Sequence, residues 1–340
     1  MTENHNYRQA IELIERANSI LLTTHTKPDG DACGSMRAMQ DVLTALGKHV
    51  QPLVLTHVPD WYAFLFEQKV PILGEDLSVE DLQGGSLGSF DLVLIVDTNS
   101  RTQLGKIAPY LDAADIPVLV IDHHATSDNL GTVEIVDSSA AAAGLVAFGL
   151  LKYAGWPVTE RIAESLFIAI ATDTGWFQFS NTDARVYRAC ADLIDLGANP
   201  TVLYDKLYNT FSGRRFKLMV AMLNSLELHL DGRYASQHIT RQDFERIGAQ
   251  YVDSENLINE CHRIESVKAS ALFIELKDGR IRCSLRSRGM LDVSQIAQQF
   301  GGGGHKMAAG TYLPGPLENA KSLVYELMEA NQDKLVVSAP

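Results

Sequence analysis

The first two-thirds of the chain alternate short, continuously apolar runs with longer segments of helical periodicity. The apolar runs are SILLTT (19–24), HVQPLVL (49–55), DLVLIVD (91–97) and PVLVID (117–122). Runs of this length without polar alternation are typical of parallel strands that are buried on both faces. Between and after them, segments such as SMRAMQDVLTALG, AAAAGLVAFGLLKYAG and ERIAESLFIAIAT have helical patterns. Strands that alternate with helices predict an open, mostly parallel α/β sheet.

The pattern changes after residue 212. The segment GRRFKLMVAMLNSLELHL, which begins at Gly213, is amphipathic and predicts a linker helix over 213–230. Beyond it, RYASQHIT, ASALFIELKDGRIRCSLRS and TYLPG predict strands, and Asp278-Gly279 is a strong hairpin signal. SENLINECHRI, VSQIAQQF and ENAKSLVYELMEA predict helices. We therefore expect an α/β protein with a first domain over 1–212 and a smaller α/β domain over 231–335.

Composition places the chain among intracellular globular proteins. At 340 residues, 46% of them apolar, it can fill two cores. Its four cysteines have no paired spacing, which argues against a zinc ribbon or a disulfide framework and indicates a reducing, cytoplasmic compartment. The polar, amphipathic amino terminus is unlike a signal peptide. No apolar run approaches the roughly 20 residues needed to cross a bilayer, so no membrane attachment is expected.

The net charge of −13 changes the list of expected partners. A chain this acidic lacks the broad basic surface that long duplex nucleic acid requires. A small phosphorylated substrate in a local basic pocket stays compatible with it. Residues 279–310 carry five Lys or Arg against one Asp, a local excess of four positive charges.

Acidic and histidine residues recur where the predicted strands and one apolar helix end. The set is His25, Asp29, Asp31, Asp97, Asp122, His123, His124 and Asp173. The carboxyl ends of parallel strands converge on one crevice, where α/β proteins bind ligands. Taken singly, the aspartates could be turn residues or helix caps. Their recurrence on one predicted edge favours bound cations, because crowded carboxylates repel one another unless they are protonated or neutralised.

The residue types narrow the choice of metal. Mixed carboxylate and imidazole ligands without thiolate favour Mn²⁺, Co²⁺ or Fe²⁺ over structural zinc. A set made only of oxygen ligands would have suited Mg²⁺ or Ca²⁺ better. Six ligands with one shared carboxylate suit two ions roughly 3.5–4 Å apart, the arrangement that serves phosphoryl displacement by water. We expect two divalent ions, with Mn²⁺ favoured.

Together these motifs resemble those of the DHH phosphoesterase superfamily. The matching stretches are HTKPDGDACGS (25–35), the strand end at Asp97, the DHH triplet at 122–124 and TDTG around Asp173. In the carboxyl-terminal part, CSLRS and GGGGHKMAAG resemble the signature of the DHH-associated domain. The resemblance spans nearly the whole chain, and its layout is most similar to the nanoRNases, which degrade short RNA and dephosphorylate 3′-phosphoadenosine 5′-phosphate.

The resemblance implies a role for each matching residue. One ion would be held by His25, Asp29 and Asp97, and the other by Asp31, Asp97, His123 and Asp173, with Asp97 bridging. Asp122 would orient a neighbouring ligand. His124 would face the scissile phosphate, stabilising charge or protonating the leaving oxygen. A water activated by the two ions would be the nucleophile, so no serine or cysteine nucleophile is required.

The second domain would bind the nucleotide end of the substrate. The resemblance assigns this contact to the GGGGH segment and the SLRS strand, that is, to Gly303, Gly304, His305, Arg286, Ser287 and Arg288. Glycines let backbone N–H groups approach an anion closely, although a glycine run is ordinarily a flexible linker. Alternate residues of a strand share a face, so Arg280, Arg282, Arg286 and Arg288 could line one side. A solvated basic strand face stays open for Arg280 and Arg282.

The expected substrates are RNA oligonucleotides of two to five nucleotides and nucleotide bisphosphates. Trp176, Phe177 and Phe179 follow Asp173 and could stack a base, although core packing is the commoner role of such residues. Within the superfamily, a cyclic- or linear-dinucleotide phosphodiesterase is the alternative. The recombination-type exonucleases are longer, and pyrophosphatases are not expected to carry GGGGH. A non-catalytic nucleotide sensor is disfavoured by the intact ligand set. The resemblance leaves the oligomeric state open, and a homodimer is one candidate.

Overall fold

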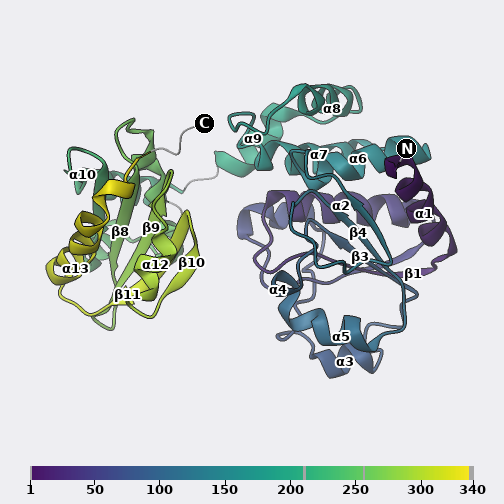
Figure 1. The fold of residues 1–340 in the computed structure, drawn as a ribbon, viewed down its shortest axis with the longest axis horizontal. Coiled ribbons are helices and arrows are strands. Elements are labelled where there is room, and N and C mark those ends of the chain that lie inside the picture. The colour runs from purple at the N-terminus through teal and green to yellow at the C-terminus, as the bar shows by residue number, and fades with distance from the viewer. Residues whose placement is uncertain (1, 210–211, 256, 337–340) are drawn as a thin grey trace. The chain divides into compact units, whose positions relative to one another are not determined.

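The computed structural model describes residues 2–209, 212–255 and 257–336. The chain divides into two compact units, residues 1–210 and 211–340 (Figure 1). Each unit has its own sheet and its own core. None of the helices in the described residues is long and apolar enough to cross a membrane.

The first unit is built on a five-stranded parallel sheet. Its strands are β1 (Ser19–Thr23), β2 (His49–Pro52), β3 (Leu92–Val96), β4 (Val118–Asp122) and β5 (Val133–Val136), in the order β2-β1-β3-β4-β5. The predicted parallel α/β class is therefore confirmed. β2 is shorter than the apolar run over 49–55, and it ends at Pro52, which has no N–H for a ladder.

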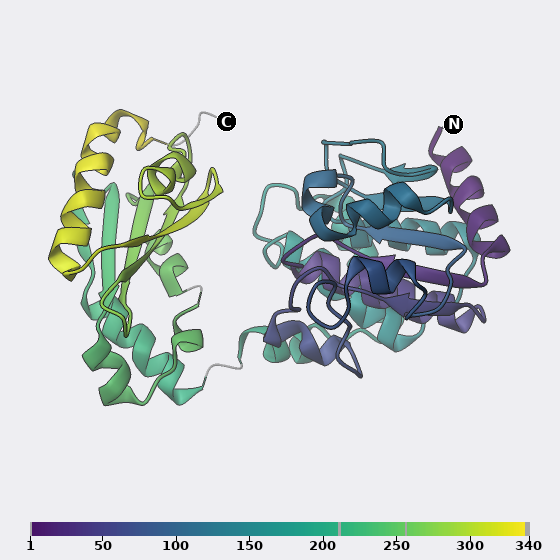
Figure 2. The same ribbon diagram turned by 90° about the horizontal axis from the view of Figure 1, so that it is seen from below.

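Helices cover both faces of this sheet, as Figures 1 and 2 show. One layer contains α1 (Thr2–Arg16), α2 (Gly30–Ala45), α6 (Ala143–Ala154) and α7 (Glu160–Asp173), and the other contains α3 (Val79–Gln83), α4 (Arg101–Leu104) and α5 (Ala108–Ala113). Ile20 and Leu22 of β1 face the first layer, whereas Leu21 faces the second. This alternation is why the strands are apolar throughout.

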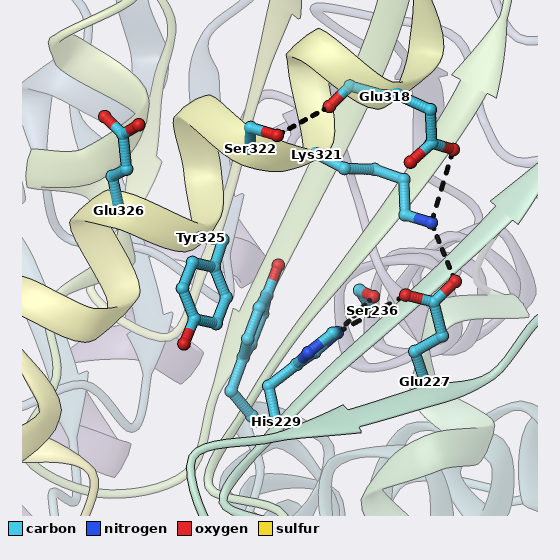
Figure 3. A pocket seen from close by; sticks show the side chains of 9 residues that line it. Glu227, His229, Ser236, Glu318, Lys321, Ser322, Tyr325 and Glu326 are labelled. Atoms are coloured by element: carbon cyan, nitrogen blue, oxygen red, sulfur yellow. Dashed lines mark hydrogen bonds and ion pairs between the residues drawn. The ribbon is translucent and has the colours of Figure 1, made fainter.

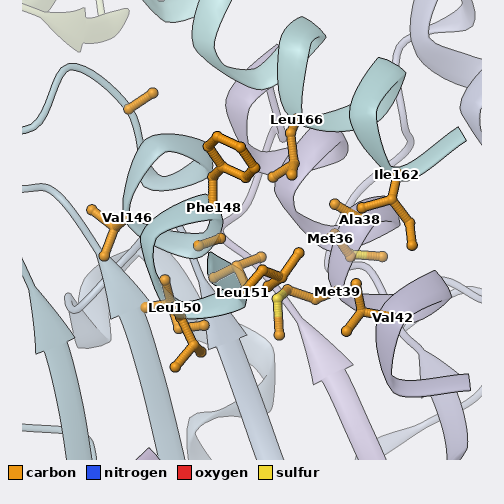
Figure 4. Packing of buried hydrophobic residues seen from close by; sticks show 14 of the residues in the cluster. Met36, Ala38, Met39, Val42, Val146, Phe148, Leu150, Leu151, Ile162 and Leu166 are labelled. Carbon is orange, nitrogen blue, oxygen red and sulfur yellow. The ribbon is translucent and has the colours of Figure 1, made fainter. Parts of the chain in front are cut away.

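The core of the first layer lies between α2, α6 and α7 (Figure 4). Met36 and Met39 of α2 pack there with Phe148 and Leu151 of α6 and Leu166 of α7. Two further helices, α8 (Ala184–Asp195) and α9 (Pro200–Tyr208), pack against α7. This dense packing fixes the ends of α2 and α7, which both carry predicted ligands.

The second unit contains a six-stranded mixed sheet in the order β10-β11-β9-β8-β7-β6. The strands are β6 (Glu227–His229), β7 (Tyr234–Ile239), β8 (Ala269–Glu275), β9 (Ile281–Ser287), β10 (Gly303–His305) and β11 (Ala308–Leu313). Its helices are α10 (Gly213–Asn224), α11 (Arg241–Ile247), α12 (Val293–Gln298) and α13 (Leu317–Ala330). α12 and α13 pack on one face, and α10 covers part of the other through Leu218 and Met222.

Three features of the second unit differ from the sequence-based expectation. The helix expected over 254–264 is replaced by short 3-10 segments at Tyr251–Ser254 and Leu257–Arg263, in which Leu257, Ile258 and Cys261 are buried. A segment of seven residues is too short to sustain an α-helix by itself, so its packing decides its conformation. The linker helix expected over 213–230 ends at Asn224, and Glu227–His229 forms the edge strand β6 instead, where it pairs with β7. The glycine run is not a flexible linker, because Gly303–His305 pairs with β11 as an edge strand.

Candidate metal centre

The order of the first sheet reverses between β1 and β3, and the predicted ligands lie at that point. In open α/β sheets the crevice beyond the carboxyl ends of the strands at such a reversal is the usual ligand site. His25 follows β1, Asp97 follows β3, and Asp122 ends β4 with His123 and His124 directly after it. Asp29 and Asp31 lie at the start of α2, and Asp173 is the last residue of α7.

The first group of side chains consists of His25, Asp29 and Asp97, whose ligand atoms all lie within 4.8 Å of one another. His25 Nε2 is 3.3 Å from Asp97 Oδ2 and 4.0 Å from Asp29 Oδ1. Three ligand atoms converging from a strand end, a turn and a second strand end could hold one ion.

The second group consists of Asp31, His123 and Asp173, again with ligand atoms within 4.8 Å. His123 Nε2 lies 3.7 Å from Asp31 Oδ2 and 3.6 Å from Asp173 Oδ2. It also lies 3.5 Å from Asp97 Oδ1. Asp97 therefore presents one carboxylate oxygen to each group, which is the geometry that a bridging ligand needs.

Asp97 is buried and has an uncommon backbone conformation. Its side chain is 2% exposed, and its Oδ1 is buried with no hydrogen-bond partner among the described residues. Its backbone has φ 61°, a left-handed conformation that is uncommon outside glycine. A buried carboxylate oxygen that accepts no hydrogen bond is costly, and strained backbone concentrates at functional sites. A cation beside Asp97 would compensate that oxygen, so the residues present fit a metal.

The charges of the cluster support the same conclusion. Burial lowers the pKa of His25 and of His123, but the Asp97 carboxylate outweighs it and raises the pKa of each to about 9. Burial, followed by the charges of Asp97 and Asp173, raises the pKa of Asp31 well above its usual value. Burial also raises the pKa of Asp173 to about 6. The raised pKa values mean that protons on these imidazole and carboxyl groups offset the negative charge of the cluster. Bound divalent cations would take the place of those protons.

Asp31 is positioned by groups far away in the sequence. Its two oxygens accept hydrogen bonds from the backbone N–H groups of Ala143 (2.5 Å) and Gly144 (2.9 Å) at the start of α6, and Ser35 Oγ donates to it at 3.0 Å. Sequence reasoning missed these three donors. The small-residue run SSAAAAG and the Ser in HTKPDGDACGS were the available signals.

Glycines allow α2 to approach α7 closely enough to bring the two groups together. A Cβ at Gly30 would overlap Thr172 beside Asp173, and a Cβ at Gly34 would lie 2.5 Å from the backbone oxygen of Ser165. Without these glycines the helices would have to separate, and Asp31 would move away from Asp173.

Asp29 has a second, structural role. Its Oδ1 accepts hydrogen bonds from the backbone N–H groups of Asp31 and Ala32, so it is the N-cap of α2. The capping alternative raised by the sequence is therefore present at Asp29. It is compatible with metal binding, because the side chain is 57% exposed and lies in the first group.

Asp122 and His124 form a pair beside the cluster. His124 Nδ1 donates to Asp122 Oδ1 at 2.8 Å, and this hydrogen bond raises the pKa of His124. Asp122 is fully buried and also accepts from the backbone N–H of His123. The His124 side chain is 42% exposed, and its Nδ1 lies 3.9 Å from Asp97 Oδ1. The structure thus also forms a third possible ligand group, Asp97, His123 and His124.

Comparison with known proteins identifies the family. Residues 19–170 match the model of the DHH family, N-terminal domain, and residues 239–332 match the DHHA1 domain. The chain is 31% identical over 310 residues to the bifunctional oligoribonuclease and PAP phosphatase NrnA of Thermus thermophilus, covering 90% of this chain and 88% of that relative. The chain belongs to the DHH family. The resemblance drawn from the sequence motifs is confirmed.

A further relative and two solved structures are similar to most of the chain. The protein of the same name from Bacillus subtilis is 27% identical over 89% of this chain and 91% of its own. Among solved structures, an exopolyphosphatase-related protein from Bacteroides fragilis has a TM-score of 0.86 at 24% identity, covering 97% of both chains. The exonuclease RecJ, crystallised bound to manganese, has a TM-score of 0.52 at 16% identity, covering 96% of this chain and 94% of that one. These structures support the fold of both units.

The residues predicted to bind substrate lie in the DHHA1 unit. Arg286 is half-buried on β9 beside Ser270 of β8 and Ala308 of β11. Its neighbour Ser287 is on the opposite face of the strand and is buried, with its hydroxyl donating to the backbone oxygen of Leu291. The structure therefore separates Arg286 from Ser287.

The other arginines of this segment do not form one continuous row. Arg280 forms an ion pair with Asp278 in the hairpin turn, and Arg282 binds the hydroxyl of Tyr251. Arg288 follows β9 and donates to the backbone oxygen of His262. Burial, and then the charge of Arg282, lowers the pKa of Arg286. An anion beside Arg286 would compensate its buried charge.

The glycine run has both packed and open positions. A Cβ at Gly302 would overlap the backbone oxygen of Gly310. Gly304 has φ 142°, and a Cβ there would lie 2.5 Å from the backbone oxygen of Ala308. A Cβ at Gly303 would meet no atom within 4 Å. Packing therefore does not require a glycine at position 303, and the space beside Gly303 is open. The backbone of His305 closes β10, and its side chain lies outside the described part of the structure.

A separate hollow of about 480 Å³ lies between β6, β7 and α13 (Figure 3). The lysine that lines this hollow is already paired with carboxylates, because Lys321 Nζ lies 2.8 Å from Glu227 Oε1 and 3.6 Å from Glu318 Oε1. His229 Nε2 is 2.8 Å from Ser236 Oγ. The residues that line it include none of the predicted substrate ligands, so this hollow has no evident part in binding phosphate.

Proposed function

We propose that this protein is a cytoplasmic phosphodiesterase that degrades very short RNA oligonucleotides to mononucleotides and also dephosphorylates 3′-phosphoadenosine 5′-phosphate. The observation that carries the proposal is Asp97, a buried residue with left-handed backbone at the switch point of the sheet, whose two carboxylate oxygens face the two ligand groups. The names of the Thermus and Bacillus relatives supply the substrate class.

The two ligand groups suit two divalent ions. The mixture of imidazoles and carboxylates favours Mn²⁺. His25, Asp29 and Asp97 would hold one ion, and Asp31, Asp97, His123 and Asp173 the other. Bound divalent ions polarise phosphoryl oxygens and lower the pKa of water, which makes water a nucleophile at neutral pH.

The side chains around the ions would orient the reaction. Hydrolysis adds water to phosphorus and breaks the bond to the leaving nucleoside oxygen, which must take up a proton. His124 is anchored through Nδ1 to Asp122 and stays partly exposed, so the Nε2–H of its doubly protonated ring could supply that proton. The hydrogen bond to Asp122 favours this form, because it raises the pKa of His124. Asp122 fixes the tautomer and the ring orientation.

The DHHA1 unit would bind the rest of the nucleotide. Arg286 provides a half-buried positive charge, and Gly303 leaves open space for a phosphate on the edge strand. Gly304, His305 and Arg288 complete the proposed contacts, as implied by the family motif. This local patch favours small substrates over long duplexes, which need a broad basic surface.

The proposed function is tested first by a panel of substrates and metals. Purified protein treated with chelator should lose hydrolysis of diribonucleotides and of 3′-phosphoadenosine 5′-phosphate, and Mn²⁺ should restore it best among divalent ions. Cyclic dinucleotides, pyrophosphate and 20-nucleotide RNA complete the panel. Release of mononucleotide or phosphate is measured by chromatography.

Two outcomes would contradict the proposed function. Full activity in chelator would exclude the metal centre as the catalyst. A clear preference for cyclic dinucleotides or pyrophosphate would leave the metal centre intact and replace the substrate class.

A second prediction concerns Arg286. Replacing it with glutamine should leave metal content unchanged and lower kcat/KM for diribonucleotides by roughly ten- to hundredfold, because a charge-assisted contact to phosphate is lost. Hydrolysis of bis-p-nitrophenyl phosphate, which has no nucleoside for the DHHA1 unit to bind, should change little. Arg280→Gln is the matched control, since Arg280 is exposed and paired with Asp278.

Equal losses on both substrates would argue that Arg286 maintains the fold rather than binding substrate. Metal content by elemental analysis and a thermal unfolding curve for each variant separate these cases.

A further inference from the structure

The loop that leaves the metal centre after Asp173 has an unusual backbone. Gly175, Trp176 and Phe177 all have positive φ, at 56°, 56° and 68°. Positive φ in a bulky residue is an outlier, and two in succession are costly. The loop is nevertheless firmly held, since Gln178 and Phe179 both donate backbone hydrogen bonds to Thr174 O.

The far end of the loop is anchored at the metal centre as well. The side-chain amide of Asn181 donates to the backbone oxygen of Asp173 at 3.1 Å and to that of Ala141 at 3.2 Å. The adjacent Ala140 O is 3.3 Å from His123 Nδ1. The loop from 174 to 181 therefore starts and finishes against residues that carry or support the second ligand group.

The strained backbone sorts the aromatic side chains into two environments. Trp176 and Phe177 turn inward and contact Phe167 of the core edge-to-face, at 6.0 Å between ring centroids in each case. Phe177 also stacks on Tyr187 at 5.7 Å. Core packing, the commoner role considered for these residues, therefore accounts for both rings.

Phe179 differs. It is 58% exposed, and it has no ring contact with any aromatic residue in the part of the chain that the structure describes. Its ring lies across Gly175, where a Cβ would overlap it. Gly175, two residues after Asp173, thus lets the ring lie close to the backbone, and the ring is otherwise largely open to solvent.

We propose that the Phe179 ring is the stacking surface for the nucleobase next to the phosphate being cleaved. The inference rests on the proposed function, because the occupant is the base of a nucleotide whose phosphate lies at the metal centre. The location supports it, since the ring lies in a short loop fixed to Asp173. An aromatic face in a rigid loop beside a phosphate site is a sequence-tolerant base platform, since every base has a π-face.

The test compares a nucleotide with its base-free counterpart. Full-length protein with saturating Mn²⁺ is titrated with adenosine 5′-monophosphate and with ribose 5-phosphate by calorimetry. Phe179→Leu should raise the Kd for adenosine 5′-monophosphate by about five- to a hundredfold and leave that for ribose 5-phosphate unchanged. Phe179→Trp should keep wild-type affinity or improve it, because it restores an aromatic face.

Kinetics give a second readout that a purely structural role would not produce. For a diribonucleotide, Phe179→Leu should raise KM and change kcat little, because stacking stabilises the ground state and the transition state alike. Phe216→Leu is the matched control: Phe216 is 54% exposed, is also a phenylalanine, and lies on α10 of the other unit. It should affect neither ligand.

Three outcomes would overturn the inference. Equal weakening of both ligands would mean that Phe179 shapes the metal centre, and no weakening of either would mean that the base lies elsewhere. A change in sedimentation behaviour with unchanged nucleotide binding would assign the ring to contact between copies of the chain.

The inference and the proposed function fail separately. If wild-type protein binds adenosine 5′-monophosphate through Phe179 but hydrolyses no oligonucleotide, the nuclease assignment is lost and the stacking surface is kept. If wild-type protein and Phe179→Leu hydrolyse diribonucleotides with the same KM, the stacking surface is lost and the nuclease assignment is kept.

Discussion

Replacing Asp97 with alanine should remove metal from both ligand groups and lower hydrolysis of every substrate by more than about a thousandfold, since bound ions contribute several kcal/mol to transition-state stabilisation. Asp97 presents Oδ2 to His25 at 3.3 Å and Oδ1 to His123 at 3.5 Å, so a single substitution affects both groups. Elemental analysis after dialysis against Mn²⁺ measures the loss directly, independently of activity.

The matched control is Asp29→Asn. Asp29 belongs to the first ligand group and caps α2, and asparagine is an equally good N-cap. This variant should keep the fold and the metal of the second group while weakening the first. Asp29→Ala would confuse the two roles, because loss of the cap alone costs about 0.5–2 kcal/mol of stability.

Near-complete retention of metal in Asp97→Ala would contradict the bridging assignment. So would an Asp29→Asn protein that loses as much metal as Asp97→Ala. An unfolding curve of each metal-free variant shows whether a loss reflects the ligands or the fold.

The sequence predicted the position of this site because the signals were local. Each of His25, Asp97 and His123 directly follows an apolar run, and parallel strands place their carboxyl ends on one edge. Asp173 was identifiable in the same way, at the end of an apolar helix. The parallel α/β class followed from the same strand pattern, because strands buried on both faces cannot alternate.

Contacts between distant segments could not be predicted in this way. The Asp31 carboxylate accepts hydrogen bonds from backbone N–H groups of α6 that lie 112 and 113 residues away in the sequence. These hydrogen bonds form only once α6 has docked against α2. The glycine-run strand β10 depends on pairing with β11, since glycine itself has low strand propensity. The 3-10 segment Leu257–Arg263 likewise takes its conformation from burial rather than from helical periodicity.

The sequence did contain one signal that was not used. Arg286 and Ser287 are adjacent in a predicted strand, and adjacent side chains point to opposite faces. Their assignment to one substrate surface conflicts with that alternation, and in the structure the Ser287 hydroxyl binds Leu291 O inside the core.

Removing the imidazole of His124 should slow hydrolysis of a diribonucleotide by about 10²- to 10⁴-fold, the usual contribution of a positioned general acid. The effect should depend on the leaving group. A p-nitrophenyl ester of a nucleoside 5′-phosphate releases a stable phenolate that needs no proton, so His124→Ala should cleave it at close to the wild-type rate. Metal content should not change.

Comparing the two leaving groups distinguishes the two roles that the structure allows for His124, general acid and metal ligand. Its Nδ1 is bound to Asp122 at 2.8 Å, which suits an oriented acid, yet His124 also forms a possible ligand group with Asp97 and His123. If it is a ligand, His124→Ala will lose metal and cleave both substrates poorly. If it is the acid, only the substrate with the nucleoside leaving group will suffer, and Asp122→Asn should reproduce part of the loss by releasing the ring orientation. Equal rates for wild type and His124→Ala on the diribonucleotide would exclude both roles.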